Sequence, residues 1–240
     1  MPLDTQSHPL ETGIIDISRA NVGQGHRYSV DGIKRMPSVT GIAKHVEGDT
    51  FGIGVNWAAK MIRDTGDPDA PKNHSKQARN EGEKLHDEIS KYIEEGIVTE
   101  DSPMFLAWLG MANRLDTENG EQFIKAERYL YHPELKYGGT CDAISQDASG
   151  RFHLWDWKTK DRESFEKQGS TGYLKDDVQL AAYVHALWSM NSIWKPTRAY
   201  VCYVMRDGSY AVHREIDIEH SMKLFVASWH IHKLLEEVKG

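Results

Sequence analysis

The segment from Tyr137 to Lys160, with the sequence YGGTCDAISQDASGRFHLWDWKTK, constrains the fold of this chain most strongly. It predicts two β-strands joined by a tight turn at residues 147–150, where a glycine supplies the positive φ that a hairpin turn needs. The first strand carries Asp142, and the second carries Asp156 and Lys158. Charged groups on a central, packed element are costly unless they are paired, so their presence here indicates more than a structural hairpin.

Alternation along the second strand separates two faces. Residues two apart share a face, so Leu154, Asp156 and Lys158 point one way. Trp155 and Trp157 point the other way and form a large apolar surface that can be buried. Two carboxylates that meet with a lysine beside them suit a hard divalent cation and a phosphate group.

The composition fits one sizeable globular domain in a reducing compartment. The 240 residues are 39% hydrophobic, which is enough for a core, and the formal net charge is -7. A negative chain has no global field that attracts nucleic acid, which counts mildly against a passive nucleic-acid binder. Two cysteines, Cys141 and Cys202, cannot provide a four-cysteine zinc or iron–sulfur site within one chain. The sequence has no secretory signal and no long apolar run, so we expect a cytoplasmic protein without a membrane segment.

Glycine, proline and capping residues indicate a division of the chain at about residue 71, within one compact domain. Residues 1–71 are expected to form strands and helices accessory to a core at 72–240, which ends in a C-terminal hairpin and helix. The accessory part is expected to contain a frayed segment at 1–12, a strand at 14–17, a hairpin turn at Asp31-Gly32, a helix from the N-cap Ser38 through Val46, a helix at 55–63 and a mobile loop at 64–71. The core is expected to contain helices at about 72–95, 103–116, 174–190 and 218–238, strands at 122–132, 199–205 and 210–216 beside the central hairpin, and a polar loop at 161–172.

The spacing of Asp142 and Asp156 leaves two interpretations open. Either both carboxylates and the carbonyl of Trp157 ligate magnesium or manganese, or they are surface residues with Lys158 in an ordinary ion pair. A D/E-x-K triplet alone does not decide, because one occurs by chance on the order of every hundred positions. The segment Pro133–Lys136 matches the literal pattern PD/E-x-K, but it precedes a Gly-Gly pair and lacks an apolar strand, so we interpret it as a decoy.

The order of the motifs along the chain is more specific than any one of them. The pieces that carry it lie between Tyr28 and Met205: YSVDGIKRMPSVTGIAKHV, EGEKLHDEI, AERYLYHPELKYGGTCDAI, LWDWKTK and VQLAAYVHAL. This ordered set resembles the PD-(D/E)XK nuclease superfamily, and within it the RecB-like branch of the mitochondrial genome maintenance exonuclease and phage exonucleases. The resemblance implies an α+β fold with an α/β-type, restriction-endonuclease-like core, in which helices flank a central mixed β-sheet.

The resemblance also implies metal ligands. Asp142 and Asp156 would ligate Mg²⁺ or Mn²⁺ together with the carbonyl of Trp157, and His86 would complete the shell or orient a ligand water. A half-buried structural histidine is the alternative for His86. No iron–sulfur cluster is expected, in contrast to several RecB-like nucleases that carry four cysteines.

Four further residues receive catalytic roles from the resemblance. Lys158 would orient the attacking water or offset charge on the phosphate. Gln179 and Tyr183, four apart on one helix face, would hold the phosphate backbone or Lys158, and a polar cap and a core tyrosine are the alternatives. Glu127 is either a carboxylate beside the metal ligands or a strand residue that pairs with Lys125 or Arg128.

These roles predict a metal-dependent deoxyribonuclease, and first an exonuclease for single-stranded or frayed DNA ends in repair, recombination or replication. A structure-specific or duplex endonuclease and a non-catalytic DNA-binding module are the alternatives. The expected partners are DNA and a replication or recombination protein, in a bacterial or phage-infected cell, and the oligomeric state stays open. Six basic residues either mark a DNA path or form ordinary solvated faces: Lys72, Lys76, Arg79, Lys160, Arg162 and Lys167. Three aromatic residues either stack on bases or pack in the core: Trp57, Trp108 and Tyr173.

Overall fold

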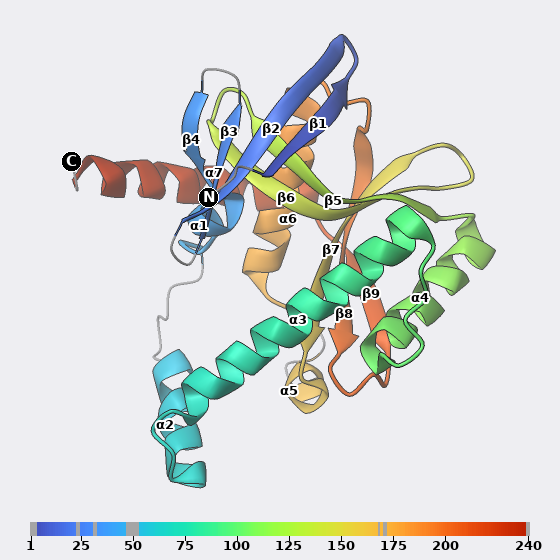
Figure 1. Cartoon of the computed structure of the whole chain (residues 1–240). Coiled ribbons are helices and arrows are strands. Elements are labelled where there is room, and N and C mark those ends of the chain that lie inside the picture. Colours follow the sequence, from blue (N-terminus) through green and yellow to red (C-terminus); the bar gives the residue numbers. More distant parts are fainter. Residues whose placement is uncertain are drawn as a thin grey trace.

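The computed structural model describes residues 4–22, 25–30, 33–46, 53–167, 169 and 172–238. Its strands and helices follow one another in this order (Figure 1): β1 (Asp4–Leu10), β2 (Gly13–Val22), β3 (Gly25–Val30), β4 (Ile33–Pro37), α1 (Val39–Ala43), α2 (Ile53–Thr65), α3 (Ala70–Glu95), α4 (Pro103–Asn119), β5 (Gln122–His132), β6 (Tyr137–Gln146), β7 (Phe152–Lys160), α5 (Arg162–Lys167), α6 (Leu174–Ser189), β8 (Pro196–Met205), β9 (Ala211–Glu215) and α7 (Ile218–Glu237).

A mixed five-stranded sheet forms the centre of the molecule (Figure 1). Its order is β5-β6-β7-β8-β9, with β7 and β8 parallel and the other neighbouring pairs antiparallel. A parallel pair requires a crossover connection, and the segment that holds α5 and α6 provides it. A second, antiparallel sheet of β1 to β4, the N-terminal sheet, packs against β5 and β6. The predicted α+β fold with a mixed central sheet is therefore confirmed.

Two apolar clusters cover the two faces of the central sheet. One joins α6, α7 and the N-terminal sheet, and the other joins α3 and α4. Alternation on β7 distributes its side chains as predicted, because Leu154 enters the first cluster while Trp155 and Trp157 enter the second. The two indole rings are only 1% and 2% exposed, so their burial fixes β7 between the helix layers.

The N-terminal sheet differs most from the prediction. A frayed segment at 1–12 is wrong for Asp4–Leu10, which is strand β1 and pairs along its whole length with β2. Cross-strand polar pairs link the two strands, for example Ser7 Oγ to Asp16 Oδ1 at 2.7 Å. The polar sequence of β1 carries no apolar alternation, so the partner strand rather than the local pattern makes it extended.

Other N-terminal expectations are partly confirmed. Val30 pairs with Ile33, as a hairpin requires, and the turn residues 31–32 lie outside the described residues. Ser38 caps α1 by accepting a bond from a backbone N–H, but the helix is shorter than predicted and ends at Ala43.

The predicted loops contain more helix than expected. Only residues 66–69 separate α2 from α3, and the segment 161–172 holds α5. The decoy Pro133–Lys136 lies in the turn between β5 and β6, as predicted. The division at residue 71 stays a prediction. Tyr28 of the N-terminal sheet and Tyr129 of β5 belong to one apolar cluster, so the two parts share a core.

Candidate active site

The two strands of the central hairpin separate at one end. Their backbone pairing stops at Ala143 and Trp155, although β6 continues beside β5 and β7 beside β8. The next residue of β6, Asp142, accepts the N–H of Trp157 at its Oδ2, at 2.6 Å. A side chain thus takes over a backbone bond, and the opened end of the hairpin lets side chains of neighbouring elements meet.

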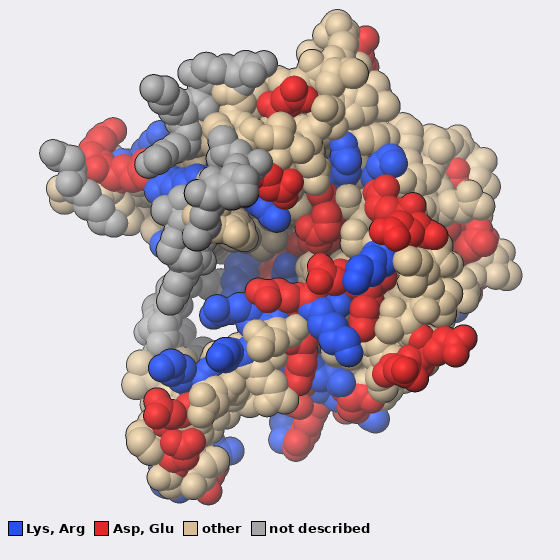
Figure 2. Space-filling model, in the orientation of Figure 1, with Lys and Arg blue, Asp and Glu red and all other residues tan. Residues whose placement is uncertain are grey.

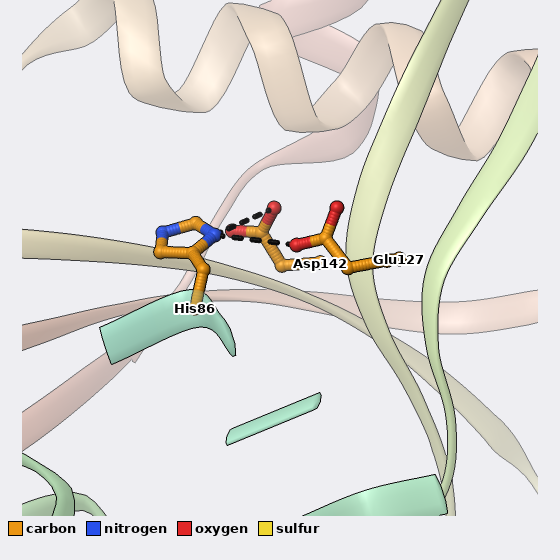
Figure 3. A group of neighbouring side chains, drawn as sticks. All are labelled: His86, Glu127 and Asp142. Atoms are coloured by element: carbon orange, nitrogen blue, oxygen red, sulfur yellow. Dashed lines mark hydrogen bonds and ion pairs between the residues drawn. The ribbon is translucent and has the colours of Figure 1, made fainter. Parts of the chain in front are cut away.

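Three side chains from three elements converge at this opening, and Figure 3 shows them turned toward one another. His86 comes from α3, Glu127 from β5 and Asp142 from β6. His86 Nδ1 lies 3.4 Å from Glu127 Oε1 and 3.6 Å from Asp142 Oδ1, and His86 Nε2 lies 3.3 Å from the carbonyl oxygen of Trp157. One ligand atom of each of the three side chains lies within 4.8 Å of the others, a spacing at which they can share one ion.

Glu127 holds its place at the cost of backbone strain. Its φ is 48°, in the left-handed region that residues other than glycine rarely adopt, at a cost of about 1–3 kcal/mol. Gln6 of β1 clamps both sides of it, because its Nε2 donates to Glu127 O at 2.9 Å and its Oε1 accepts from Tyr129 N at 3.0 Å. The N-terminal sheet therefore stabilises the conformation that directs this carboxylate toward His86.

Asp156 and Lys158 form the second part of the site. Lys158 Nζ lies 2.5 Å from Asp156 Oδ2, and Asp156 is fully buried. Gln179 of α6 donates to Asp156 Oδ1 at 3.1 Å and is 3.0 Å from the Tyr183 hydroxyl. The ring of Tyr183 packs against Gly139, where a Cβ would come within 2.3 Å of it, so this glycine is needed for close approach. Gln179 contacts Asp156 directly, and so reaches Lys158 only through that carboxylate.

Burial and crowding raise the affinity of both aspartates for protons. Burial raises the pKa of the Asp142 carboxyl, against the effect of the neighbouring His86, and Glu127 raises it further. Burial likewise raises the pKa of Asp156 to about 7, although Lys158 opposes it. Two buried aspartates and the nearby Glu127 thus share the site with two basic groups, His86 and Lys158.

The two basic groups respond in the opposite sense. Burial lowers the pKa of His86, but Asp142 and Glu127 outweigh burial and raise it to about 9. Burial also lowers the pKa of Lys158, yet Asp156, followed by Asp142, raises it above its usual range. Lys158 therefore remains an ammonium ion at neutral pH and can donate but not abstract a proton.

The site opens into a cleft with a cavity volume of about 660 Å³. Its walls come from the strands β1, β2, β3, β5 and β7 and from the helix α3: Asp4, Gln6, Arg19, His26, Ala78, Arg79, Gly82, Glu83, His86, Asp87, Glu127, Tyr129, Trp157, Lys158 and Thr159. Figure 2 shows Lys and Arg side chains gathered along α3, beside a hollow below the N-terminal strands. Charges of both signs thus line the cleft: Asp4, Glu83, Asp87 and Glu127 lie beside Arg19, Arg79 and Lys158.

Part of the predicted DNA path lies at the cleft. Arg79 lines the cleft, whereas Arg162 and Lys167 pair with glutamates one helical turn away on α5. Trp108 is fully buried and belongs to the core, while Trp57 and Tyr173 are 41% and 37% exposed.

The structure brings most of the predicted site residues together, and the wall of the cleft adds residues that the sequence did not predict. His86, Glu127, Asp142 and the Trp157 carbonyl meet as expected, while Asp156 faces Lys158 and stands outside the three-residue group. Gln6 and Arg19 were missed because the polar N-terminus carries no motif and only the pairing of β1 and β2 brings it to the cleft. The residues predicted to pair with Glu127 do not: Lys125 lies 3.4 Å from Glu94 and Arg128 donates to Ser7 O.

The donor set fits a hard divalent cation. The set contains three groups that offer oxygen, namely two carboxylates and one main-chain carbonyl, and one imidazole that offers nitrogen. Mg²⁺ and Mn²⁺ accept such a set of ligands. The four groups offer many acceptor atoms and only one ring that can donate, so a bound cation would add positive charge where the acceptors gather.

The sequence profile described as the PD-(D/E)XK nuclease superfamily matches residues 36–237. This chain belongs to that superfamily. The superfamily's name matches the chemistry of the site, in which acidic residues and a lysine follow one another on adjacent strands. None of the described helices of this superfamily member is long and apolar enough to cross a membrane.

Solved structures with similarity to this superfamily member share little sequence with it. The structure of SSO0001 is 15% identical, with 72% of this chain and 69% of that chain covered and a TM-score of 0.35. The alkaline exonuclease LHK-Exo from Laribacter hongkongensis is 14% identical, with 65% and 84% covered and a TM-score of 0.33. Its complex with dAMP gives 14%, 65% and 84%, and 0.31. No curated protein matches the sequence.

Proposed function

We propose that this protein is a metal-dependent deoxyribonuclease that hydrolyses phosphodiester bonds at single-stranded or frayed DNA ends, as an exonuclease. One observation carries the proposal: His86, Glu127 and Asp142 converge beside the Asp156–Lys158 pair in an open cleft of a PD-(D/E)XK superfamily fold. The resemblance of the motifs to the RecB-like exonuclease branch supports the choice of an exonuclease.

The size of the cleft supports a single strand. About 660 Å³ lies within the range of pockets for small ligands, and one or a few nucleotides fit in such a volume. An end or an unpaired region of DNA would have to enter it.

Asp142, the Trp157 carbonyl and His86 would hold Mg²⁺ or Mn²⁺, and the His86 ring would give up its extra proton when the ion binds, with Glu127 as the further carboxylate and Asp156 adjacent. When bound, the ion polarises the phosphate and lowers the pKa of a water molecule. Glu127 and Asp142 also hold the His86 ring in one orientation between them.

Lys158 would act as a fixed positive charge. Because its pKa is raised, it donates hydrogen bonds to the phosphate or to the attacking water and does not remove a proton. Water attacks phosphorus and gives up one proton to bulk water, the bond from phosphorus to the leaving oxygen of the next nucleotide breaks, and that oxygen takes up a proton from bulk water, while the ammonium offsets the charge that develops. Asp156 positions this ammonium, and Gln179 in turn holds Asp156.

A cleavage assay tests the proposal. Linear single strands labelled at either end and a closed single-stranded circle are incubated with Mg²⁺ or Mn²⁺, and in parallel with EDTA. We expect stepwise shortening of the linear strands with metal, no cleavage with EDTA and an intact circle. Cleavage of the circle would identify an endonuclease, and intact linear DNA with either metal would refute the proposal.

Two lysine variants make the assay specific. Lys158→Ala is expected to lose activity. Lys136→Asn, in the decoy triplet, is expected to keep it, since Lys136 lies in a turn and asparagine tolerates its φ of 56°. Equal activity in wild type and Lys158→Ala would also refute the proposal, and DNA binding that survives EDTA without any cleavage would indicate a non-catalytic module.

A further inference from the structure

Arg19 is a charged residue on the inward face of the N-terminal sheet. It follows Ile15 and Ile17 at every second position of β2, and Ile17 is fully buried. Its cross-strand partner on β3, Tyr28, is buried as well. If packing alone determined the residue at position 19, the alternation would place an apolar side chain there. The arginine therefore needs another explanation.

The Arg19 side chain lies in the wall of the cleft. It lines the same cavity as His86, Glu127 and Lys158 and is 28% exposed. Its guanidinium carbon lies 4.8 Å from the ring centre of Tyr129, which holds the side chain in place by cation–π contact. The N–H donors of a guanidinium lie in its own plane, so a group fixed in this way can still bind an anion in bidentate fashion.

One carboxylate competes for Arg19 only weakly. Arg19 Nη2 lies 3.6 Å from Asp4 Oδ2, which is beyond hydrogen-bond length. Asp4 is 61% exposed in its side chain, and it also accepts the hydroxyl of Tyr129. Such a solvent-screened pair contributes little, whereas a phosphate offers two oxygens to the guanidinium fork.

We propose that Arg19 binds a phosphate of the nucleic-acid strand in the cleft, across from Arg79 of α3. The N-terminal sheet thereby becomes part of the substrate site, although β1, β2 and β3 precede the residues 36–237 that the superfamily profile matches. This inference rests on the proposed nuclease function and adds a residue to the same site.

The test compares cleavage kinetics across a salt series for wild type, Arg19→Gln, Arg19→Lys and the control Arg27→Ala. Arg27 is on the neighbouring strand β3, is half-buried, and does not line the cleft. Glutamine keeps much of the stem above Tyr129 while it removes the charge, so folding is preserved, and thermal melts verify this. Each enzyme is assayed on single strands with a 5′-phosphate and with a 5′-hydroxyl.

For Arg19→Gln we expect KM to rise about tenfold with kcat nearly unchanged, because a contact with phosphate outside the reacting bond is lost. The slope of log(kcat/KM) against log[salt] should fall by about 0.7, as for one phosphate contact on a single strand. Arg19→Lys should fall between Arg19→Gln and wild type, and Arg27→Ala should match wild type.

An equal loss on both strands assigns Arg19 to an internal phosphate, and a loss only on the 5′-phosphorylated strand assigns it to the terminal one. If wild type cuts DNA and Arg19→Gln matches Arg27→Ala in KM and salt slope, the inference is wrong and the nuclease proposal stands. If wild type does not cut DNA, both fail.

Discussion

Two clusters of acids with a histidine lie at opposite ends of the β6–β7 hairpin. The open cluster contains His86, Glu127 and Asp142, where the strands separate. The closed cluster contains Glu121, Asp147 and His153, at the turn end. Both combine two carboxylates with one imidazole, so residue types alone do not distinguish them.

The closed cluster satisfies its carboxylates from within the protein. His153 Nδ1 is 2.8 Å and 3.0 Å from the two oxygens of Glu121, which also accepts the hydroxyl of Ser145. Asp147 accepts bonds from Ser149 and Arg151. Its two carboxylates have donors in short contact, so the cluster can stabilise the turn without any ligand.

The open cluster has the opposite balance. Its His86 contacts are 3.3–3.6 Å long, and one ring faces two carboxylates and a carbonyl. Burial, which raises the pKa values of Asp142 and Asp156, adds to the cost of keeping these carboxylates charged. The comparison teaches that a functional site is recognised by carboxylates that the protein leaves without close hydrogen-bond donors, rather than by the types of residue in it.

The largest expected effect is a loss of nuclease activity when the open cluster is changed. Asp142→Asn should reduce nuclease activity by about a thousandfold, since a ligand of the metal is lost. In EDTA its melting temperature should stay near that of wild type or rise, because a buried carboxylate beside Glu127 is neutralised. Paired cleavage assays and thermal melts check this, and a strongly lowered melting temperature would mean that Asp142 is structural.

The matching change in the closed cluster should act on stability. Glu121→Ala leaves the buried Ser145 and His153 without their acceptor, so unfolding free energy should fall by about 3 kcal/mol. The activity of the folded fraction should stay near wild type. Urea unfolding beside cleavage assays measures both, and loss of activity without loss of stability would contradict the contrast.

The pH dependence of stability sharpens the comparison for the open cluster. The pKa of His86 is raised to about 9 because Asp142 and Glu127 outweigh its burial, so the folded state binds the proton more tightly than the unfolded state. This contribution is fully present below pH 6.5 and is lost as pH rises through 9. We expect metal-free protein to lose up to about 3 kcal/mol of stability over this range.

The same measurement has a built-in control. Asp142→Asn should flatten the pH dependence, because the main carboxylate that raises the pKa of His86 is removed. Melts from pH 6.5 to 9 in EDTA decide, and an equally steep curve in wild type and Asp142→Asn would show that His86 is not the group that titrates.

The smallest expected effect concerns the support of the open cluster. Gln6→Ala removes the clamp on the strained backbone of Glu127, so activity should fall about tenfold and more metal should be needed for half-maximal rate. Gln6→Glu keeps the acceptor for Tyr129 N and should recover part of the loss. Titration of activity with Mn²⁺ tests this, and an unchanged metal requirement would mean that Glu127 needs no clamp.

Much of the fold could be predicted from the sequence because local signals agreed. The strand Gln122–His132 and the helices that end at Gly96 and near Ser189 match their predicted bounds closely. In each, apolar periodicity and a terminating residue point to the same element. The polar N-terminus offers no such signal, and β1 was therefore predicted wrongly.

For the site, the sequence by itself determined the chemistry: two aspartates and a lysine on adjacent strands, one of which buries two tryptophans on its other face. Alternation has a period of two, so Asp156 and Lys158 must share a face wherever the strand lies. Only the tertiary structure decided the partners of these groups. The separation of β6 from β7, the strained φ of Glu127 and the cleft wall with Gln6 and Arg19 arise from contacts between distant segments, and a local pattern carries no record of them.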